Sequence, residues 1–598
     1  MKPFTVVSDA AHKRLAVAEG RLVCTSVVDP ATGAEYVSRP FVEFEFRADG
    51  QAPTAITVSR RGNTVTLAYP NGLAAEMRYA TRPGAGLLQT LTFRNGGKRS
   101  VRLSDVSTGA FLCAPGKFAE CRFYAGSDRR EMPPCFCLDG TDDRLTCFNP
   151  AYKEGWVAGS FVPGILRYML FFPHWGCARS GYSRSGVPFS RTLAPGETWM
   201  CDPTFFACFR GGLDEADRVS AATARLGIPD PAPPGVMYCT WLPFLKDISE
   251  SLVAELAPAA KAVGAKYFVL DDGWFTGEDR AVDTVKFPHG LAAVSRIVHD
   301  AGLRFGLWYN IGTGYGLRRA EERFACRNED GSVKYGGGYP AFCFGSAYRE
   351  KVAAELRELA ERYAVDYFKL DFSAISSPYG MLPWGCHAHD HAFHRDFSDS
   401  IGAMYDGLRF ISSELRRAFP KLLTDFSFEV FGPDRPSFAA LRASVIHHVS
   451  NLSGNHPEFQ SPLQIRRTFG RWFPGYPAER ILGGLVTLHE ATAEESFLTA
   501  LAGAPLIAGD LRKLSAATRA RLADHAARFD AAAMRDPEMD LELLADEPDF
   551  DAFRRIGPSG HGFVCAFNRG DRARRIAGVA VPPGKCVMRD FQTIARTP

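Results

Sequence analysis

Two adjacent carboxylates form the first group of residues that could do chemistry. Asp271 and Asp272 end the apolar run KYFVL and are followed by Gly273 and Trp274. An acidic pair beside an exposed indole suits a sugar, because sugar hydroxyls donate hydrogen bonds to carboxylates and the C–H face of the ring packs on an aromatic side chain. A metal-binding aspartate pair or a helix N-cap fits the same motif equally well.

A further carboxylate, Asp371, follows Lys369 by two residues in the run DYFKLDF. Side chains two apart on a strand lie on the same face. A carboxylate beside an ammonium stays ionised, as a nucleophile attacking an anomeric carbon must be. The alternative is a purely structural ion pair between the two side chains.

A cluster of histidines lies in the run CHAHDHAFHRD, downstream of Asp371. With Asp390, the residues His387, His389, His391 and His394 could bind zinc or a similar ion. We expect instead a loop that covers the substrate, with one histidine bonded to the sugar, and we predict no metal site and no cofactor.

The elements that must position these residues are short apolar strands alternating with helices, the pattern of a parallel β/α fold. Seven such strands are recognisable, and one more is expected between residues 470 and 490. Eight strands over about 290 residues fit a closed barrel better than an open sheet. The seven strands are VMYCTW, KYFVLDD, RFGLWYN, DYFKLDF, LLTDFSFEVF, VIHHVSNL and PLIAGDL.

A helix is expected between the first two strands. At its start, Asp247 and Glu250 could form a capping box.

The fold class predicted is multidomain α/β, with a central (β/α)8 TIM-like barrel. Residues 1–228 read as repeated short strands and are expected to form an N-terminal antiparallel β-sandwich. The proline-rich run GIPDPAPPG marks a boundary, so the barrel is placed at 229–525. Strand-like runs then predict a small C-terminal β domain over residues 526–598.

Composition limits the partners and the compartment. The 598 residues carry 70 basic and 67 acidic side chains, a near balance that argues against nucleic acid or an anionic membrane as partner. The start of the chain lacks a signal-peptide h-region, and no stretch is apolar enough to span a membrane. The 15 cysteines are scattered and suggest no disulfide framework. These features predict a cytoplasmic protein, with a homo-oligomer possible.

The ordered set of motifs carries a family resemblance. YCTWLPFLKDIS, AKYFVLDDGWF, KFPHGLAAVSRIVHDAGLRFGLW, DYFKLDF and PLIAGDLRKLS occur in sequence over roughly residues 236–515. The set resembles the melibiase group, glycoside hydrolase family 36 of the α-galactosidase clan. The resemblance implies double displacement with retention and Asp371 as the nucleophile. It also implies a sugar pocket formed by Lys369, Asp271, Asp272, Trp241 and Trp274.

One departure from the family concerns the acid/base. The strand that ends in an aspartate in the family here presents Ser450 and Asn451, and an amide has no proton to give. Asn451 is therefore predicted only to bind substrate. Glu429 on the preceding strand is the predicted replacement, since neighbouring barrel strands allow the 5–5.5 Å carboxyl separation of a retaining site. Asp425 and Asp434 remain alternatives.

A second departure follows the third strand, where the family usually has an acidic loop and this chain reads LWYNIGTGYG. The glycines do not form a dinucleotide-binding motif, so the run is expected to form a loop at the barrel mouth.

These observations predict a retaining glycoside hydrolase that cleaves terminal α-galactosyl-type residues, with a carbohydrate as partner. Two alternatives stay open. One is a catalytically altered sugar-binding or galactosyl-transferring relative that lost the usual acid/base. The other is a metal-dependent barrel hydrolase that uses the histidine run.

Overall fold

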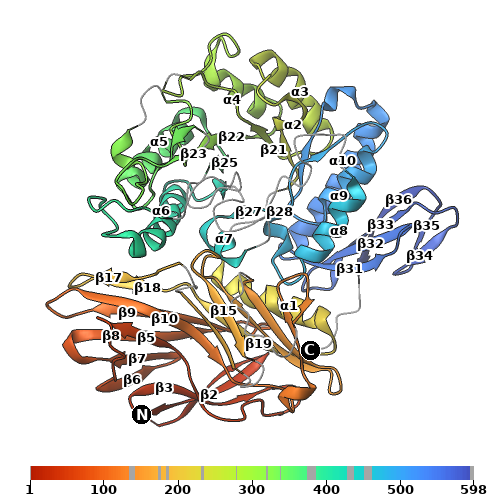
Figure 1. Ribbon diagram of the computed structural model, residues 1–598. Helices are drawn as coiled ribbons and strands as arrows, with labels where there is room; N and C mark the ends of the chain where they lie inside the picture. The colour runs from red at the N-terminus through yellow and green to blue at the C-terminus, as the bar shows by residue number, and fades with distance from the viewer. Residues whose placement is uncertain are drawn as a thin grey trace. The chain divides into compact units, whose positions relative to one another are not determined.

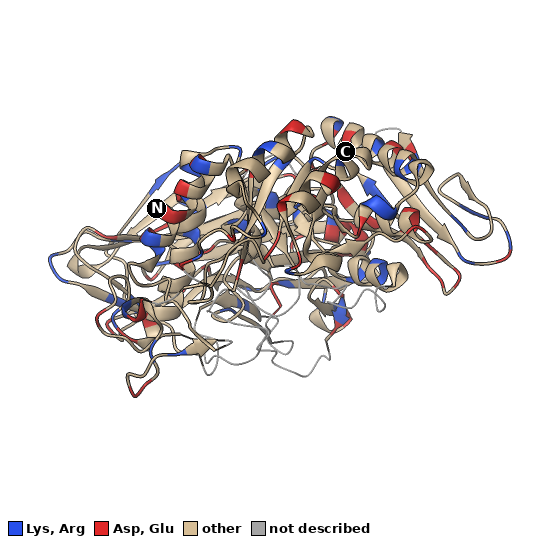
Figure 2. Cartoon of the chain, turned by 90° about the horizontal axis from the view of Figure 1, so that it is seen from above, with Lys and Arg blue, Asp and Glu red and all other residues tan. Residues whose placement is uncertain are grey.

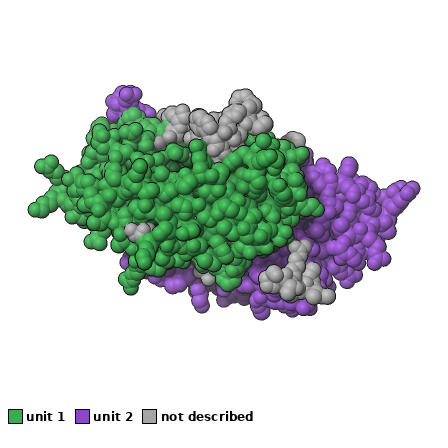
Figure 3. All heavy atoms as spheres, turned by 90° about the horizontal axis from the view of Figure 1, so that it is seen from below, with its two compact units in different colours: residues 1–229, 385–405, 437–442 green, residues 230–384, 406–436, 443–598 purple. Residues whose placement is uncertain are grey.

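The computed structural model describes residues 2–592 apart from 133–141, 173–176, 183–186, 230–234, 278, 318–320, 337, 373–384, 427–436 and 450–460. The chain divides into two compact units (Figure 3). Unit 1 comprises residues 1–229, 385–405 and 437–442, and unit 2 comprises residues 230–384, 406–436 and 443–598.

Unit 1 is built mainly from antiparallel sheets (Figure 1). A four-stranded sheet has the order β1-β2-β3-β4, and a five-stranded sheet the order β15-β16-β10-β17 with β5 paired to β10. A ten-stranded sheet has the order β12-β11-β13-β14-β19-β9-β8-β7-β6 with β18 paired to β9. The strand bounds are β1 Phe4–Ser8, β2 Ala11–Ala18, β3 Arg21–Val28, β4 Phe41–Val42, β5 Glu45–Ala48, β6 Thr57–Arg61, β7 Thr64–Ala68, β8 Leu73–Ala80, β9 Leu87–Asn95, β10 Val101–Phe111, β11 Arg122–Ala125, β12 Arg130–Glu131, β13 Arg144–Asn149, β14 Glu154–Ser160, β15 Tyr168–Phe172, β16 Cys177–Gly181, β17 Arg191–Leu193, β18 Thr198–Met200 and β19 Thr204–Arg210.

Alternating side chains explain these strands. In β8, Leu73, Ala75, Met77 and Tyr79 are buried, and the residues between them are more exposed. This period of two is typical of a sheet with one face in the core. The helix α1 (Leu213–Ala224) packs against β14 and β19. The predicted N-terminal antiparallel β region is confirmed.

Unit 2 contains a parallel sheet with nine strands among the described residues, in the order β28-β27-β26-β25-β22-β21-β20-β30-β29. The two end strands, β28 and β29, are successive pieces of one short stretch interrupted by Gly483, Gly484 and Leu485. Because β28 pairs with β27 and β29 pairs with β30, this stretch closes an eight-membered barrel. It is the strand expected between residues 470 and 490. The bounds are β20 Met237–Cys239, β21 Tyr267–Leu270, β22 Arg304–Asn310, β25 Tyr367–Asp371, β26 Leu423–Phe426, β27 Ile446–His448, β28 Ile481–Leu482, β29 Val486–Thr487 and β30 Leu506–Ala508.

Helices follow the barrel strands (Figure 1). In α4, the side chains of Leu291, Val294 and Val298 repeat at helical spacing and are buried. The predicted capping box is wrong, because α3 begins at Glu250 with Ser249 as N-cap, its hydroxyl accepting from the Leu252 N–H. The helix bounds are α2 Trp241–Phe244, α3 Glu250–Ala262, α4 Gly290–Asp300, α5 Tyr348–Tyr363, α6 Phe397–Ala418, α7 Phe438–Ala443, α8 Pro462–Trp472, α9 Ala493–Ala500 and α10 Ala516–Arg535.

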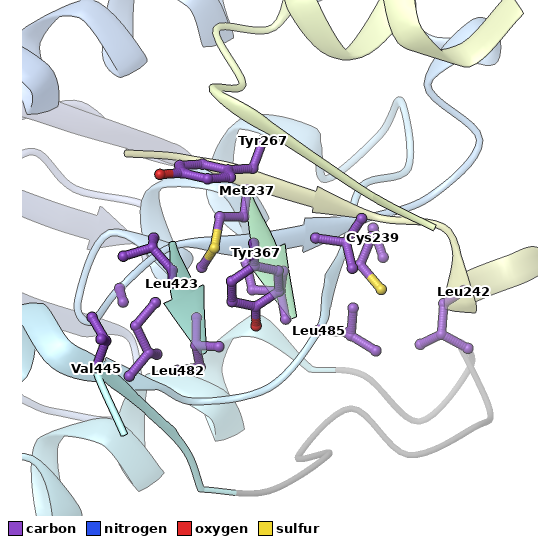
Figure 4. Close-up of a cluster of buried hydrophobic side chains, with 14 residues drawn as sticks. Met237, Cys239, Leu242, Tyr267, Tyr367, Leu423, Val445, Leu482 and Leu485 are labelled. Atoms are coloured by element: carbon purple, nitrogen blue, oxygen red, sulfur yellow. The ribbon is translucent and has the colours of Figure 1, made fainter. Parts of the chain in front are cut away.

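The barrel interior is filled by side chains from several strands (Figure 4). Met237, Tyr267, Tyr367 and Leu423 belong to one buried cluster. Since Tyr367 points into the barrel, the period of two directs the next alternate residues of β25 to the same interior face. This face leads to the open carboxyl end of the strands, where barrel enzymes place their active sites.

A four-stranded antiparallel sheet follows α10, in the order β31-β32-β33-β36, beside a hairpin of β34 and β35. Its presence confirms the predicted fold class, in which one β region precedes the barrel along the chain and another follows it. The bounds are β31 Asp540–Asp546, β32 Phe550–Ile556, β33 His561–Asn568, β34 Arg574–Ile576, β35 Val579–Val581 and β36 Lys585–Gln592.

Basic and acidic residues are interspersed along the chain (Figure 2), in keeping with the near balance of charge in the sequence. Among the described residues, no helix is both long and apolar enough to cross a membrane.

Candidate active site

The predicted site residues come from neighbouring strands of the barrel. Asp271 follows β21 directly, and Asp371 is the last residue of β25. β22 lies between these strands and is paired in parallel with both. The two carboxylates therefore lie at the same end of the barrel, where parallel strands present their carboxyl ends.

Asp271 is a buried, fully engaged carboxylate. Its Oδ2 accepts from Lys369 Nζ at 2.7 Å and from Cys239 Sγ at 3.0 Å. Its Oδ1 accepts from the backbone N–H of Asp272 at 2.9 Å, and its own N–H donates to Thr240 Oγ1 at 3.0 Å. With 1% of its surface exposed, Asp271 is fixed in position before any ligand arrives.

Lys369 forms its ion pair with Asp271, whereas the sequence suggested a partner in Asp371. Burial favours the neutral amine, but the surrounding negative charges, that of Asp271 first, and the hydrogen bond to Asp271 together outweigh it, so the pKa of Lys369 is raised above its ordinary value. The charge of Asp371 acts in the same direction. Lys369 is thus a permanent cation beneath the site.

Asp272 faces a different set of partners. Its carboxylate accepts from Tyr315 Oη at 3.1 Å and pairs with Lys246 Nζ at 3.3 Å. Burial raises the pKa of Asp272, while the Lys246 ammonium and the Tyr315 hydroxyl act to lower it. Lys246 and Tyr315 are themselves hydrogen-bonded to each other. A hydroxyl-bearing ligand could exchange for these two partly exposed side chains, which makes Asp272 a good candidate for binding ring hydroxyls.

Gly273 permits the turn that follows the acidic pair Asp271 and Asp272 after β21. Its φ of +113° is a conformation that side chains rarely adopt. A Cβ here would lie 2.8 Å from Cα and from the carbonyl oxygen of Lys246. Glycine is therefore required both for the backbone conformation and for the close approach of Lys246.

Asp371 is oriented by two donors. Trp308 Nε1 donates to Oδ2 at 3.0 Å, and the backbone N–H of Phe372 donates to Oδ1 at 2.8 Å. Trp308 lies on β22, with its Cα opposite that of Lys369. The carboxylate is only partly buried, so it remains accessible to a substrate. Two donors, one to each oxygen of the carboxylate, restrict its rotation.

The two tryptophans predicted to shape the pocket occupy different environments. Trp241 is partly buried and packs against the barrel cluster. Trp274 is 2% exposed, and its Nε1 donates to the carbonyl oxygen of Trp308 at 3.0 Å. The indole of Trp274, expected to be exposed, instead supports the strand that carries Trp308.

Asp425, one of the alternative acids, is completely buried on β26 with its Cα opposite that of Lys369. Its carboxyl accepts a hydrogen bond from the Tyr367 hydroxyl. Burial, reinforced by the charge of Asp371, raises the pKa of Asp425 to about 7, although Tyr367 and Lys369 act to lower it. Asp425 lies level with Lys369, two residues before the end of β25, and this position argues against direct contact between its carboxyl and a leaving group.

Glu429, Asn451 and Asp434 lie outside the described residues. Of the histidines, His391 and His394 are buried, His387 is partly buried and His389 is exposed. His391 and His394 are within hydrogen-bonding distance of each other.

Two residues of the site were missed by sequence reasoning. Trp308 holds Asp371, and Tyr315 holds Asp272. Trp308 lies opposite Lys369 through the pairing of β22 with β25, which the sequence alone does not give. The second lies in the glycine-rich loop after β22, which was placed at the barrel mouth without a role for its tyrosine.

Comparisons with known proteins agree with this geometry. The Melibiase family model matches residues 231–313, which include Asp271, Asp272 and Trp274. Alpha-galactosidase 2 of Pediococcus pentosaceus is 28% identical over 198 residues, covering 31% of this chain and 26% of that protein. Alpha-galactosidase AgaA of Geobacillus stearothermophilus is 28% identical over 180 residues, covering 27% of this chain and 24% of that protein. The matches thus span about a quarter of each relative's length.

Solved structures extend the likeness over the whole chain. A variant of the family 36 α-galactosidase AgaA from Geobacillus stearothermophilus, in complex with raffinose, has a TM-score of 0.76 at 14% identity and covers 99% of this chain and 100% of that one. The galactosidase domain of AgaSK, an alpha-galactosidase-sucrose kinase, has a TM-score of 0.74 at 14% identity and covers 99% of each chain. At this identity the likeness shows the fold. Together with the sequence match, it shows that the chain is melibiase-like and has the architecture of the family 36 α-galactosidases.

Proposed function

We propose that this protein is a glycosidase that hydrolyses terminal α-galactosyl residues of oligosaccharides or glycoconjugates with retention of configuration. The observation that carries the proposal is the placement of Asp371. It ends β25 at the open end of a melibiase-like barrel, and Trp308 and Phe372 hold it in one orientation.

In the first step, the Asp371 carboxylate attacks the anomeric carbon while the bond to the leaving-group oxygen breaks, which gives a glycosyl ester on the enzyme. The Lys369 ammonium, paired with Asp271, places positive charge near the nucleophile. Asp272 binds ring hydroxyls. In the second step, water attacks the ester, gives its proton to the group that protonated the leaving group in the first step, and releases the sugar with its original configuration.

The leaving-group oxygen must receive a proton in the first step, and we propose Glu429 as the donor. Asp425 is a weaker candidate because it is fully buried and bonded to Tyr367. Asn451 would contribute only hydrogen bonds to the sugar.

Replacing Asp371 tests the proposal directly. Asp371→Asn should retain the fold, because the amide oxygen can still accept from Trp308, but should lower turnover of an aryl α-galactoside by roughly 10⁴-fold or more. Asp300→Asn changes an exposed carboxylate on α4 and is the matched control. The anomer formed first, followed by proton NMR, reports retention. A variant within a few-fold of the parent would overturn the assignment of the nucleophile.

Replacing Glu429 tests the acid. Glu429→Gln should slow substrates with poor leaving groups severely and spare the first step on activated aryl galactosides, which need little protonation. Azide should rescue the second step and yield a glycosyl azide of retained configuration, because azide needs no general base. Equal losses on good and poor leaving groups, without rescue, would exclude Glu429.

The carbohydrate partner follows from this proposal. The cytoplasmic location, the homo-oligomer and the domain limits at 228 and 525 stay predictions.

A further inference from the structure

A group of soft and borderline ligands lies in the segment of unit 1 that contains residues 385–405. Cys386, His391 and His394 each offer one ligand atom, and these atoms lie within 4.8 Å of one another. Cys386 is 0% exposed, His391 9% and His394 3%. A thiol and two imidazoles gathered away from solvent form a typical ligand set for a transition metal.

We propose that Cys386, His391 and His394 bind a divalent transition-metal ion, with zinc as the best match to one sulfur and two nitrogen ligands. The spacing Cys-x4-His-x2-His supplies all three ligands from one short stretch of chain. A fourth ligand, from water or another side chain, completes the tetrahedron. The proposal differs from the sequence expectation that the histidine run holds no metal.

The distances between ligand atoms fit a tetrahedral ion. Bonds of about 2.3 Å to sulfur and about 2.0–2.1 Å to nitrogen separate S from N by about 3.6 Å and N from N by about 3.3 Å in a tetrahedral zinc site. Cys386 Sγ lies 3.6 Å from His391 Nδ1, and His391 Nδ1 lies 3.0 Å from His394 Nε2. The two imidazole rings are nearly perpendicular, at 86°, so their nitrogens approach one point without stacking.

The protein backbone supports this arrangement. The N–H of Cys386 donates to Ser400 Oγ at 3.0 Å, and Ser400 Oγ donates to the carbonyl oxygen of Phe397. The backbone of Cys386 is thereby hydrogen-bonded to the first turn of α6. An ion bound by Cys386, His391 and His394 would join the start of the segment to the residues just before α6, and its role would be structural.

Metal analysis of the purified full chain tests the proposal. Inductively coupled plasma mass spectrometry should find about one zinc ion per chain, as for a structural site. Cys386→Ser and His394→Gln should each lose most of this metal. His389→Ala is the matched control and should retain it, because His389 lies in the same segment with an exposed side chain. Metal content that is unchanged in both ligand variants would overturn the proposal.

A second measurement does not depend on the variants folding. The unsubstituted chain is stripped with a chelator and titrated with Co²⁺, whose thiolate complexes have a charge-transfer band in the near ultraviolet. We expect this band to saturate at about one equivalent and to be displaced by Zn²⁺. Absence of the band, together with absence of zinc in the chain as purified, would show that the three side chains form only a hydrogen-bonded cluster.

Discussion

Asp425 is a buried carboxyl whose pKa depends on the charges of the site. It lies in the barrel interior beside Lys369, at the level below Asp371. Burial raises its pKa to about 7, so at neutral pH it is partly protonated. When Asp425 is protonated, it adds no second buried negative charge, beside that of Asp271, near the proposed nucleophile Asp371.

This raised pKa predicts a pH-dependent stability. Between about pH 4 and pH 7 the folded chain holds a proton on Asp425 that the unfolded chain has lost, so folding stability falls as the pH rises through this window and levels off above it. Asp425→Asn removes this titration. Its stability relative to the parent should therefore increase between pH 5 and pH 8, by on the order of 2 kcal/mol.

Thermal melts at pH 5 and pH 8 measure the effect. The control Asp300→Asn, which changes an exposed carboxylate on α4, should differ from the parent by the same amount at both pH values. If the Asp425→Asn variant also behaves identically at the two pH values, the pKa of Asp425 is not raised in the folded protein.

At the scale of elements, the turn after β21 determines where Asp272 lies. Gly273→Ala would place a Cβ 2.8 Å from backbone atoms of Lys246, in a conformation with φ of +113°. Relief of this overlap should move Lys246 away from Asp272 and weaken sugar binding. We expect a loss of about 1–3 kcal/mol in stability, together with a raised KM for an aryl galactoside.

Gly277→Ala is the matched control for this turn, because a Cβ there would meet no atom within 4 Å. It should leave both the melting temperature and KM nearly unchanged. Equal behaviour of the two alanine variants would mean that the turn at Gly273 is not constrained by Lys246.

The elements also show what the sequence could predict. All seven barrel strands were recognisable because apolar runs of strand length are bounded by turns, and the ends of two of them carried Asp271 and Asp371. The eighth could be placed only approximately, because Gly483, Gly484 and Leu485 divide it into two-residue pieces. The capping residue of α3 was missed because Asp247 and Ser249 are both good caps, and the choice between them depends on where the loop turns.

The partners within the site could not be predicted in the same way. Alternation along β25 places Lys369 and Asp371 on one face, but which carboxylate contacts the ammonium depends on the neighbouring strands, and it is Asp271. The burial of Trp274 likewise depends on its contact with Trp308. Such contacts join residues that are distant in sequence, and no local pattern encodes them.

At the scale of the whole molecule, Arg555 connects the barrel of unit 2 with its C-terminal sheet. This side chain on β32 is 0% exposed. Its guanidinium donates to the carbonyl oxygens of Leu501, Ala502 and Gly503, which lie between α9 and β30, and to that of Met539 just before β31. A single cation thereby satisfies backbone groups of both parts.

Removal of this side chain should loosen the C-terminal sheet from the barrel. Arg555→Ala leaves buried carbonyl groups without a donor, at about 1–3 kcal/mol each, so we expect unfolding in urea to lose at least about 3 kcal/mol. Arg554→Ala is the matched control on the same strand. Its guanidinium is partly exposed and pairs with Glu542, so its loss should cost less than about 1 kcal/mol. If both variants unfold at the same urea concentration as the parent, Arg555 does not hold the two parts together.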